Sequence, residues 1–217
     1  MQNVGFCFAL LPIAPADDRE ARAAFLKRHL GFFNTNPVLA SYILGATATA
    51  EIAGHEAGVP EDLKRALAGP LGMAGDGLFW GAARPLAGLI GALGAWAFPR
   101  QAALALLVVY NVPHLTLRWL GVSRGAAMGP SAARDVLSEG FQRAVGVLRL
   151  AAALVAGFFL GWAIGADGGQ RGWRGLFAFA FFGLGLAATR LHVPPTVVGL
   201  AGAAAGLVLL ATGVLGG

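Results

Sequence analysis

The sequence predicts an all-α integral membrane protein, with transmembrane helices that glycine and proline break into re-entrant hairpins. Of its 217 residues, 57% are hydrophobic and only 12% are charged, whereas soluble domains carry about 25% charged residues. The mean hydropathy is +0.67. This composition leaves too little charge to cover a water-facing surface, so a lipid bilayer is the expected surrounding.

The charge balance indicates a membrane topology rather than a nucleic-acid partner. The net charge is +5, but the basic residues are spread thinly and no basic patch interleaved with aromatic residues occurs. Arginines in cytoplasmic loops explain the excess more simply. Cys7 is the only cysteine, so no disulfide within the chain and no thiolate metal site are expected.

The N-terminal part, residues 1–30, predicts an apolar segment followed by an interfacial helix. Residues 1–14 are apolar but shorter than the roughly 20 residues that span a bilayer, and no basic residue precedes them as in a signal peptide. A helix is expected to follow, because acids lie near its start, at Asp17, Asp18 and Glu20, and basic residues lie at its end, at 27–29. This order of charges is the one that the helix dipole favours. We expect this helix at the cytoplasmic interface.

Residues 31–117 contain two broken apolar segments. In the first, 31–53, Asn34-Thr35-Asn36-Pro37 interrupts the run, because proline disfavours helical backbone at the residue before it. The second, 69–98, holds Pro70, clustered glycines and Arg84-Pro85. A polar connector, 51–65, separates them, and a further apolar run ends near Pro113. Two interrupted apolar segments point to a transport site.

The remaining chain predicts a cytoplasmic basic segment and C-terminal transmembrane helices. Residues 118–149 carry five arginines against two acids, as cytoplasmic segments do. Residues 150–217 contain short apolar runs at 150–165 and 175–188, and the charge-free stretch 196–217 is the clearest span. No repeat of fixed period occurs, so residues 1–217 form a single membrane domain.

Polar residues at the two interruptions are the candidate binding groups. Asp76 lies between glycines in an apolar segment, where an ionisable group suggests function; the alternative is an acid at a loop mouth that faces water or pairs with Arg84. Asn34, Thr35 and Asn36 offer the donors and acceptors that sugar hydroxyls need, although such residues also cap broken backbone.

Two rings join these candidates. Trp80 follows Asp76 by four residues, and an aromatic face can stack on a sugar ring; the alternative is an interfacial anchor. His29 is the one histidine beside an interruption, and it either contacts a ligand or partners a helix C-terminus.

Catalytic and cofactor chemistry is not indicated. The four histidines are dispersed without metal-ligand spacing. The glycines from 69 to 77 lack the Lys-Ser/Thr of a phosphate-binding loop, and no nucleophile with a base emerges. We therefore expect no catalytic residue, metal or cofactor in this chain.

At these two interruptions the chain resembles the IID component of the mannose/fructose/sorbose family of the bacterial phosphotransferase system. The matching residues are Arg28-His29-Leu30, Phe32-Phe33-Asn34-Thr35, Pro37 and Ile43-Leu44-Gly45 in the first segment, and Gly69-Pro70-Leu71, Gly75-Asp76, Phe79-Trp80-Gly81 and Arg84-Pro85 in the second. The chain departs from the family in a shortened polar loop, 167–174, and in Gly77, where a larger residue is common.

The resemblance implies a multi-pass subunit of a sugar permease in the bacterial inner membrane. A IIC subunit would complete the hexose path, while IIA and IIB proteins would carry phosphate from phosphoenolpyruvate on their own histidines. Asn34, Thr35, Asn36, Asp76, His29 and Trp80 are then the predicted substrate-binding residues. Two rival hypotheses stay open: a degenerate scaffold or regulatory subunit of a IIC partner, and an independent ion-coupled carrier that uses Asp76.

Overall fold

The computed structural model describes residues 2–56 and 58–165, and all regular elements in these ranges are helical. They are α1 (Asn3–Leu10), η1 (Leu11–Ile13), α2 (Arg19–Leu30), α3 (Ala40–Ile52), α4 (Gly58–Leu78), the π-helical turn η2 (Phe79–Ala83), α5 (Arg84–Ala97), α6 (Pro99–Met128), η3 (Gly129–Ser131), α7 (Ala132–Leu137) and α8 (Glu139–Gly165). The predicted all-α fold is confirmed. The predicted spans within 166–217 lie outside the described residues.

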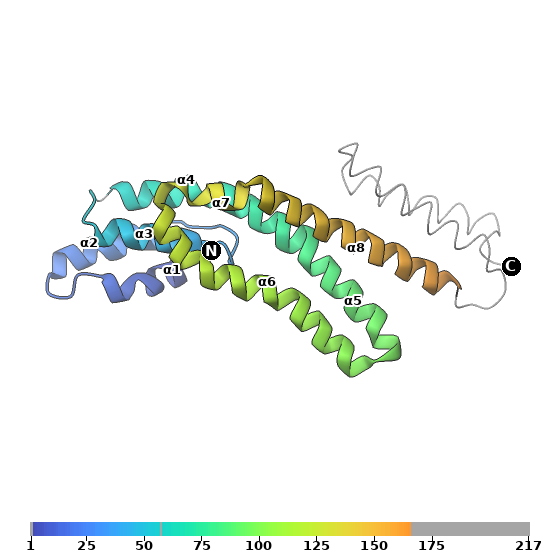
Figure 1. The fold of residues 1–217 in the computed structure, drawn as a ribbon. Coiled ribbons are helices and arrows are strands. Elements are labelled where there is room, and N and C mark those ends of the chain that lie inside the picture. The colour runs from blue at the N-terminus through green and yellow to red at the C-terminus, as the bar shows by residue number, and fades with distance from the viewer. Residues whose placement is uncertain (1, 57, 166–217) are drawn as a thin grey trace, which may run out of the picture.

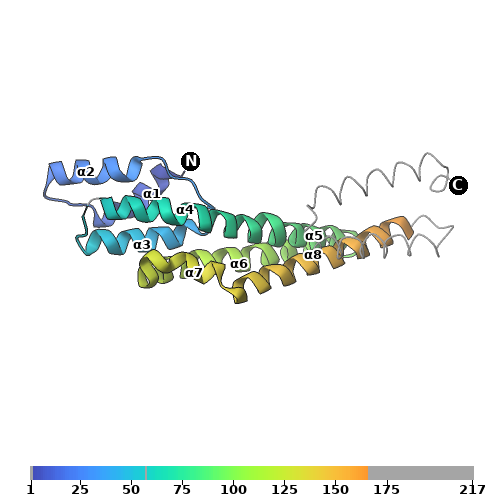
Figure 2. The ribbon, with the colours of Figure 1, turned by 90° about the horizontal axis from the view of Figure 1, so that it is seen from above.

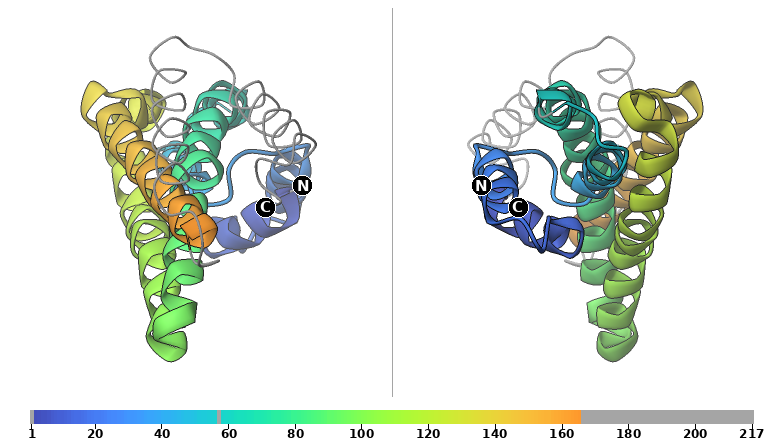
Figure 3. Two further views of the ribbon diagram at one scale, coloured as in Figure 1. Left: turned by 90° about the vertical axis from the view of Figure 1, so that its right-hand side faces the viewer. Right: turned by 90° about the vertical axis from the view of Figure 1, so that its left-hand side faces the viewer.

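The helices form a compact head with a long arm (Figures 1 and 2). The head contains α1 to α4 and α7, and the arm contains α5, α6 and α8. Seen end-on, α1 and α2 lie on one side of α3 and α4, while α6 and α8 lie on the other (Figure 3). Two helical runs, Gly58–Ala95 and Pro99–Leu137, are long and apolar enough to cross a membrane. The re-entrant hairpins stay a prediction.

The predicted helix near the N-terminus is confirmed as α2. The Asp18 carboxylate accepts hydrogen bonds from the backbone N–H groups of Glu20 and Ala21 at 2.9 and 3.0 Å, which makes Asp18 the N-cap. The basic residues Lys27, Arg28 and His29 occupy the last turn, where they face the negative end of the helix dipole.

The first predicted interruption is confirmed, but its apolar run is no single span. Residues 31–39 are non-helical and α3 begins only at Ala40, so its 13 residues are too few to cross a bilayer. The backbone N–H of Gln2 donates to the Phe33 carbonyl at 3.1 Å, and the Gln2 side chain donates to the Thr35 carbonyl at 2.6 Å. The N-terminus therefore braces the 31–39 loop.

The second predicted interruption is wrong. Helix α4 runs through Pro70 and the glycines, continues into η2 and α5, and ends only at Ala97. Proline removes one helical hydrogen bond, which neighbouring structure can offset. A Cβ on Gly72 would lie 3.5 Å from Thr35 Oγ1, so the glycines here allow the loop to approach the helix.

Three other predicted boundaries also move. The apolar run that ended near Pro113 continues within α6 to Met128, again through a proline. The short run at 150–165 is the second half of the 27-residue α8, and the polar connector shrinks to the few residues between Ile52 and Gly58. Polar residues on a solvated helical turn do not end the helix. Boundaries placed where the sequence turns polar therefore made these helices too short.

Glycines make the contact between head and arm. A Cβ on Gly121 would lie within 3.0 Å of Ser41 Cβ, and one on Gly125 within 2.9 Å of Tyr42 Cα. Only glycine allows α3 and α6 to cross this closely. The arm beyond this crossing exposes the large apolar side chains of Leu104, Leu107, Val108, Val112, Leu115 and Trp119, which suits a lipid or protein surrounding rather than water.

Candidate functional site

The two predicted motifs meet through a hydrogen bond between Asn36 and Asp76. The Asn36 amide Nδ2 donates to Asp76 Oδ1 at 2.9 Å. Asn36 Oδ1 accepts from the backbone N–H of Val38 at 3.0 Å and from that of Leu39 at 3.5 Å. The buried Asn36 side chain therefore caps the turn that leads into α3 and holds the Asp76 carboxylate at the same time.

Two further contacts fix the 31–39 loop on α4. Thr35 Oγ1 donates to the Ala68 carbonyl at 2.8 Å. Gly75 packs directly against Asn36, because a Cβ there would lie 2.5 Å from Asn36 Cβ and 2.7 Å from its Oδ1. Thr35 and Asn36 thus hold the loop, while Asn34 and Asp76 are exposed.

Asp76, Trp80 and Arg84 follow one another on an exposed strip of the helix. Trp80 is 60% exposed, and the Arg84 guanidinium carbon lies 4.5 Å from the centroid of the indole, as in a cation–π contact. Among the ion pairs of residues 2–56 and 58–165, none joins Asp76 to Arg84. Asp76 accepts from Asn36 and is exposed, so the structure shows an acid that faces water, as one half of the alternative expected, and not one paired with Arg84.

Sequence reasoning missed Arg149, which the fold brings from α8 to this strip. Its Nη2 donates to the Gly77 carbonyl at 3.2 Å and lies 3.3 Å from the position of a Cβ on Gly81. Arg149 stood out only as one of five arginines in a basic segment. No local signal joins it to Gly77, because the two residues are 72 positions apart.

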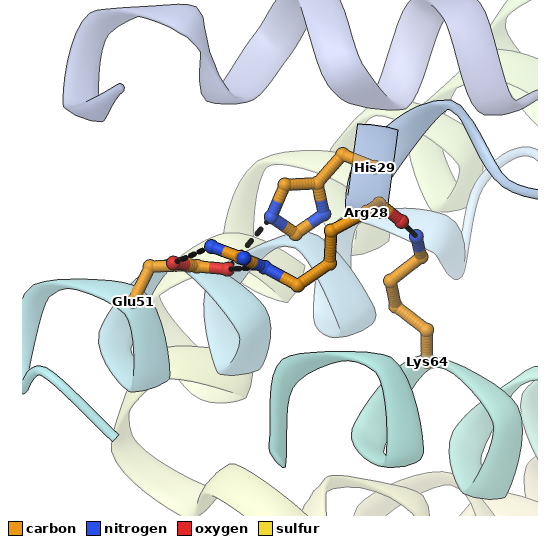
Figure 4. A network of polar contacts seen from close by, with 4 residues as sticks. All are labelled: Arg28, His29, Glu51 and Lys64. Carbon is orange, nitrogen blue, oxygen red and sulfur yellow. Dashed lines mark hydrogen bonds and ion pairs between the residues drawn. The ribbon is translucent and has the colours of Figure 1, made fainter. Parts of the chain in front are cut away.

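His29 lies in a separate, partly buried network that Figure 4 shows. Its Nε2 lies 2.8 Å from Glu51 Oε1, and Arg28 donates to both Glu51 oxygens at 2.9 Å. Lys64, itself buried, donates to the Arg28 carbonyl at 3.2 Å. The network joins the ends of α2 and α3 to α4, and the His29 side chain is fully buried.

The structure does not bring His29 to Asp76. Lys64, which belongs to the His29 network, precedes Asp76 by twelve residues on one helical run, or about 18 Å. Burial lowers the pKa of His29 below its ordinary value, the Glu51 contact opposes this, and the nearby charges of Lys64 and Arg28 lower it further. A neutral, buried ring suits support of the loop.

The described part of the chain holds no group of three or more His, Cys, Asp or Glu side chains that could bind a metal. Cys7 is buried, and burial raises the pKa of its thiol, which disfavours a reactive thiolate. The exposed strip and the 31–39 loop instead offer hydrogen-bond donors, acceptors and the exposed rings of Trp80 and Phe32. These groups suit a polar ligand that carries hydroxyl groups.

Residues 1–164 match the family model described as the mannose/fructose/sorbose family IID component of the phosphotransferase system. The chain belongs to this family. It is 35% identical over 144 residues to the mannose-specific EIID component of Escherichia coli K12, over 63% of this chain and 51% of that protein. It is 34% identical over 152 residues to the sorbose-specific EIID component of Lacticaseibacillus casei, over 64% and 52%.

A third IID relative is the fructose permease IID component of Bacillus subtilis 168, 28% identical over 150 residues, which make up 66% of this chain and 54% of that protein. This IID chain spans about half the length of the curated relatives it matches. The family membership confirms the resemblance inferred from the two motifs, and it places the Asn36–Asp76 contact within the matched residues.

Solved structures agree with a IID membrane fold. One is the cryo-EM structure of the mannose transporter ManYZ in complex with microcin E492, with a TM-score of 0.56 and 25% identity. Another, described only as a membrane protein, gives a TM-score of 0.64 with 27% identity. Both comparisons cover 98% of this chain and 89% of the other. The IID chain is therefore a helical membrane protein.

Proposed function

We propose that this chain is the IID subunit of a permease that moves a hexose across the bacterial inner membrane as the sugar is phosphorylated. The hydrogen bond between Asn36 and Asp76 carries the proposal, because it joins the two segments that hold the family motifs, beside an exposed aromatic ring. The names of the relatives, which specify mannose, sorbose and fructose, support a hexose as the substrate.

In this proposal the candidate residues divide into two roles. Asp76, Asn34 and Trp80 face the substrate: the carboxylate accepts from sugar hydroxyls, the amide donates and accepts, and the indole covers the apolar face of the ring. Thr35 and Asn36 hold the loop on α4. His29 supports the start of that loop through Glu51.

A IIC subunit completes the sugar path, and IIA and IIB proteins deliver phosphate at the cytoplasmic side. The exposed apolar arm supports a membrane-embedded partner, since it leaves residues such as Leu104, Val112 and Trp119 uncovered. The chain crosses the inner membrane several times, and the long runs Gly58–Ala95 and Pro99–Leu137 supply two of the crossings.

The test is phosphoenolpyruvate-dependent phosphorylation of labelled mannose, fructose and sorbose in vesicles that contain this chain, its IIC neighbour and the soluble partners. We expect activity on one or more of these sugars, and its loss when this chain alone is omitted. Asn34→Ala and Asp76→Asn should each weaken the apparent affinity for sugar. Asp62→Asn, an exposed acid on the same helix, is the matched control and should behave as wild type.

Two results would replace the proposal. Uptake of sugar by this chain alone, driven by an ion gradient, would favour an ion-coupled carrier. A complex that assembles but phosphorylates none of the sugars would favour a scaffold or regulatory subunit. Unchanged sugar affinity in both site variants, within an assembled and active complex, would refute the proposed site.

A further inference from the structure

Arg84 on the exposed strip and Arg149 beside it have no acidic partner among the residues that the structure describes. Arg84 and Arg149 form none of the ion pairs found among residues 2–56 and 58–165, although Arg28, Arg65, Arg124 and Arg143 each do. Both are exposed. Arg84 belongs to the apolar run Gly58–Ala95, where an unpaired charge is costly and suggests a functional partner.

Gly77 and Gly81 leave room for the Arg149 side chain to lie close to the α4–η2 helical run. The positions of a Cβ on Gly77 and on Gly81 lie 3.2 and 3.3 Å from Arg149 Nη2, so any larger residue at either site would press on the guanidinium. The bond to the Gly77 carbonyl uses one N–H of five. Within the described part of the chain, its other donors make no hydrogen bond and can serve another acceptor.

Trp80 fixes the other guanidinium in the same turn. The Arg84 guanidinium carbon lies 4.5 Å from the centroid of the Trp80 ring. Arg149 lies against the next residue, Gly81. The π-helical turn Phe79–Ala83 contains Trp80 and Gly81, the residues that Arg84 and Arg149 lie against, and such turns often occur at functional sites. Both planar guanidinium groups therefore lie against the same helical turn, and their shape suits the oxygens of a phosphate group.

We propose that Arg84 and Arg149 bind the phosphate group of a phosphorylated hexose. The inference rests on the proposed function, because it assigns these residues to the product of that reaction. Trp80 lies midway between the two ends of the strip, four residues after Asp76 and four before Arg84. The Asp76 carboxylate repels the phosphate and accepts from hydroxyls, so the sugar lies toward Asp76 and the phosphate toward Trp80 and Gly81, where both arginines make contact.

The experiment measures binding to the complex purified from membranes with the partner that accompanies this chain. The probes are the free hexose, the same hexose 6-phosphate, inorganic phosphate, and nanodiscs of phosphatidylglycerol against phosphatidylcholine. The variants are Arg84→Gln, Arg149→Gln and the two lysine replacements, which keep the charge but lose the planar guanidinium. Arg143→Gln is the control, because Arg143 lies six residues before Arg149 on α8 and is 79% exposed.

Each glutamine variant should weaken hexose 6-phosphate binding about tenfold or more, and each lysine variant less, while free hexose binding stays within about twofold. Competition by inorganic phosphate should be lost in parallel. The control should match wild type. If a glutamine variant does not assemble, its lysine counterpart serves, and wild-type affinity for hexose 6-phosphate in that variant overturns the proposal.

Three other results also overturn the phosphate site. One is unchanged hexose 6-phosphate affinity in the glutamine variants. Another is an equal loss for free and phosphorylated hexose, which indicates a general structural defect. The third is a loss confined to phosphatidylglycerol nanodiscs, which assigns the arginines to a lipid headgroup. Failure of the proposed function is distinct, since free hexose then fails to bind even to wild type.

Discussion

The Asn36 amide donates to the Asp76 carboxylate at 2.9 Å and joins residues 40 positions apart. The same Asn36 side chain accepts two backbone N–H groups at the start of α3. The buried Asn36 amide therefore accepts hydrogen bonds from backbone N–H groups at the start of α3 and orients Asp76, the acid that faces the proposed substrate. Changes at Asn36 should affect both the stability of the loop and the position of the acid.

Asn36→Ala should lower the stability of the chain by about 1–3 kcal/mol. The substitution leaves the backbone N–H groups of Val38 and Leu39 without their side-chain acceptor, and Asp76 loses its donor. Thermal unfolding of the purified protein in detergent measures the effect. Asp76→Asn is the comparison, because an amide there can still accept from Asn36. Equal loss in the two variants would contradict this account.

Gly75→Ala should disrupt the site, whereas Gly69→Ala on the same helix should not. A Cβ at residue 75 would lie 2.5 Å from Asn36 Cβ, so the 31–39 loop has to move away. Nothing lies within 4 Å of a Cβ at residue 69, and alanine there favours the helix by up to about 1 kcal/mol. Sugar phosphorylation in vesicles and thermal unfolding should both separate the two variants.

The stability of the chain should fall in mild acid because of His29. Burial lowers the pKa of His29 from 6.5, so the folded chain keeps the ring neutral where the unfolded chain protonates it. Unfolding therefore takes up a proton. The contribution to stability is complete above pH 6.5 and is lost as the pH falls from 6.5 through the folded pKa.

His29→Gln tests this pH dependence, because glutamine can still donate to Glu51 but does not titrate. Unfolding temperatures from pH 8 to pH 5 should fall less steeply in the variant than in wild type. The charged groups that face His29 are Glu51, Arg28 and Lys64, and they are the same in both proteins. Parallel curves would show that His29 does not titrate in this range.

Glu51→Gln should cost up to about 3 kcal/mol, the lower end of the range for breaking a buried ion pair, because this pair is partly buried. Glu51 neutralises Arg28 and contacts His29, and the Arg28 and Glu51 side chains are only 15% and 12% exposed. Glu61→Gln is the control on α4, since Glu61 pairs with Arg65, which is 76% exposed, and surface pairs contribute little. Thermal unfolding measures the loss of stability in both variants. A similar small loss in each would contradict the prediction.

Local signals in the sequence predicted several features correctly. Asp18 and the basic end of α2 marked a helix because capping and dipole effects act within one turn. Pro37 marked the non-helical loop before α3. Their polar side chains at the two interruptions indicated Asn34, Thr35, Asn36 and Asp76 as candidate binding residues, and the structure brings Asn36 and Asp76 into contact.

Features that depend on distant partners were not predictable. Pro70 and the glycines near it suggested a break, yet a glycine that admits a neighbouring backbone looks the same in sequence as one that ends a helix. The role of Gly75 became clear only with Asn36 against it. Arg149 likewise acquired its position from the contact with Gly77 across 72 residues.

The π-helical turn Phe79–Ala83 also sets the rotational phase of the arm. A turn with i→i+5 bonding holds one more residue than an α-helical turn, so it accommodates that residue without rotating the helix beyond it. If the turn took α-helical geometry with the same number of residues, everything beyond it would rotate by about 100° about the helix axis. Arg84 would then leave the side of Trp80, and the glycines of α5 would no longer meet α6. The wide geometry of this one turn therefore keeps the binding strip and the arm in register.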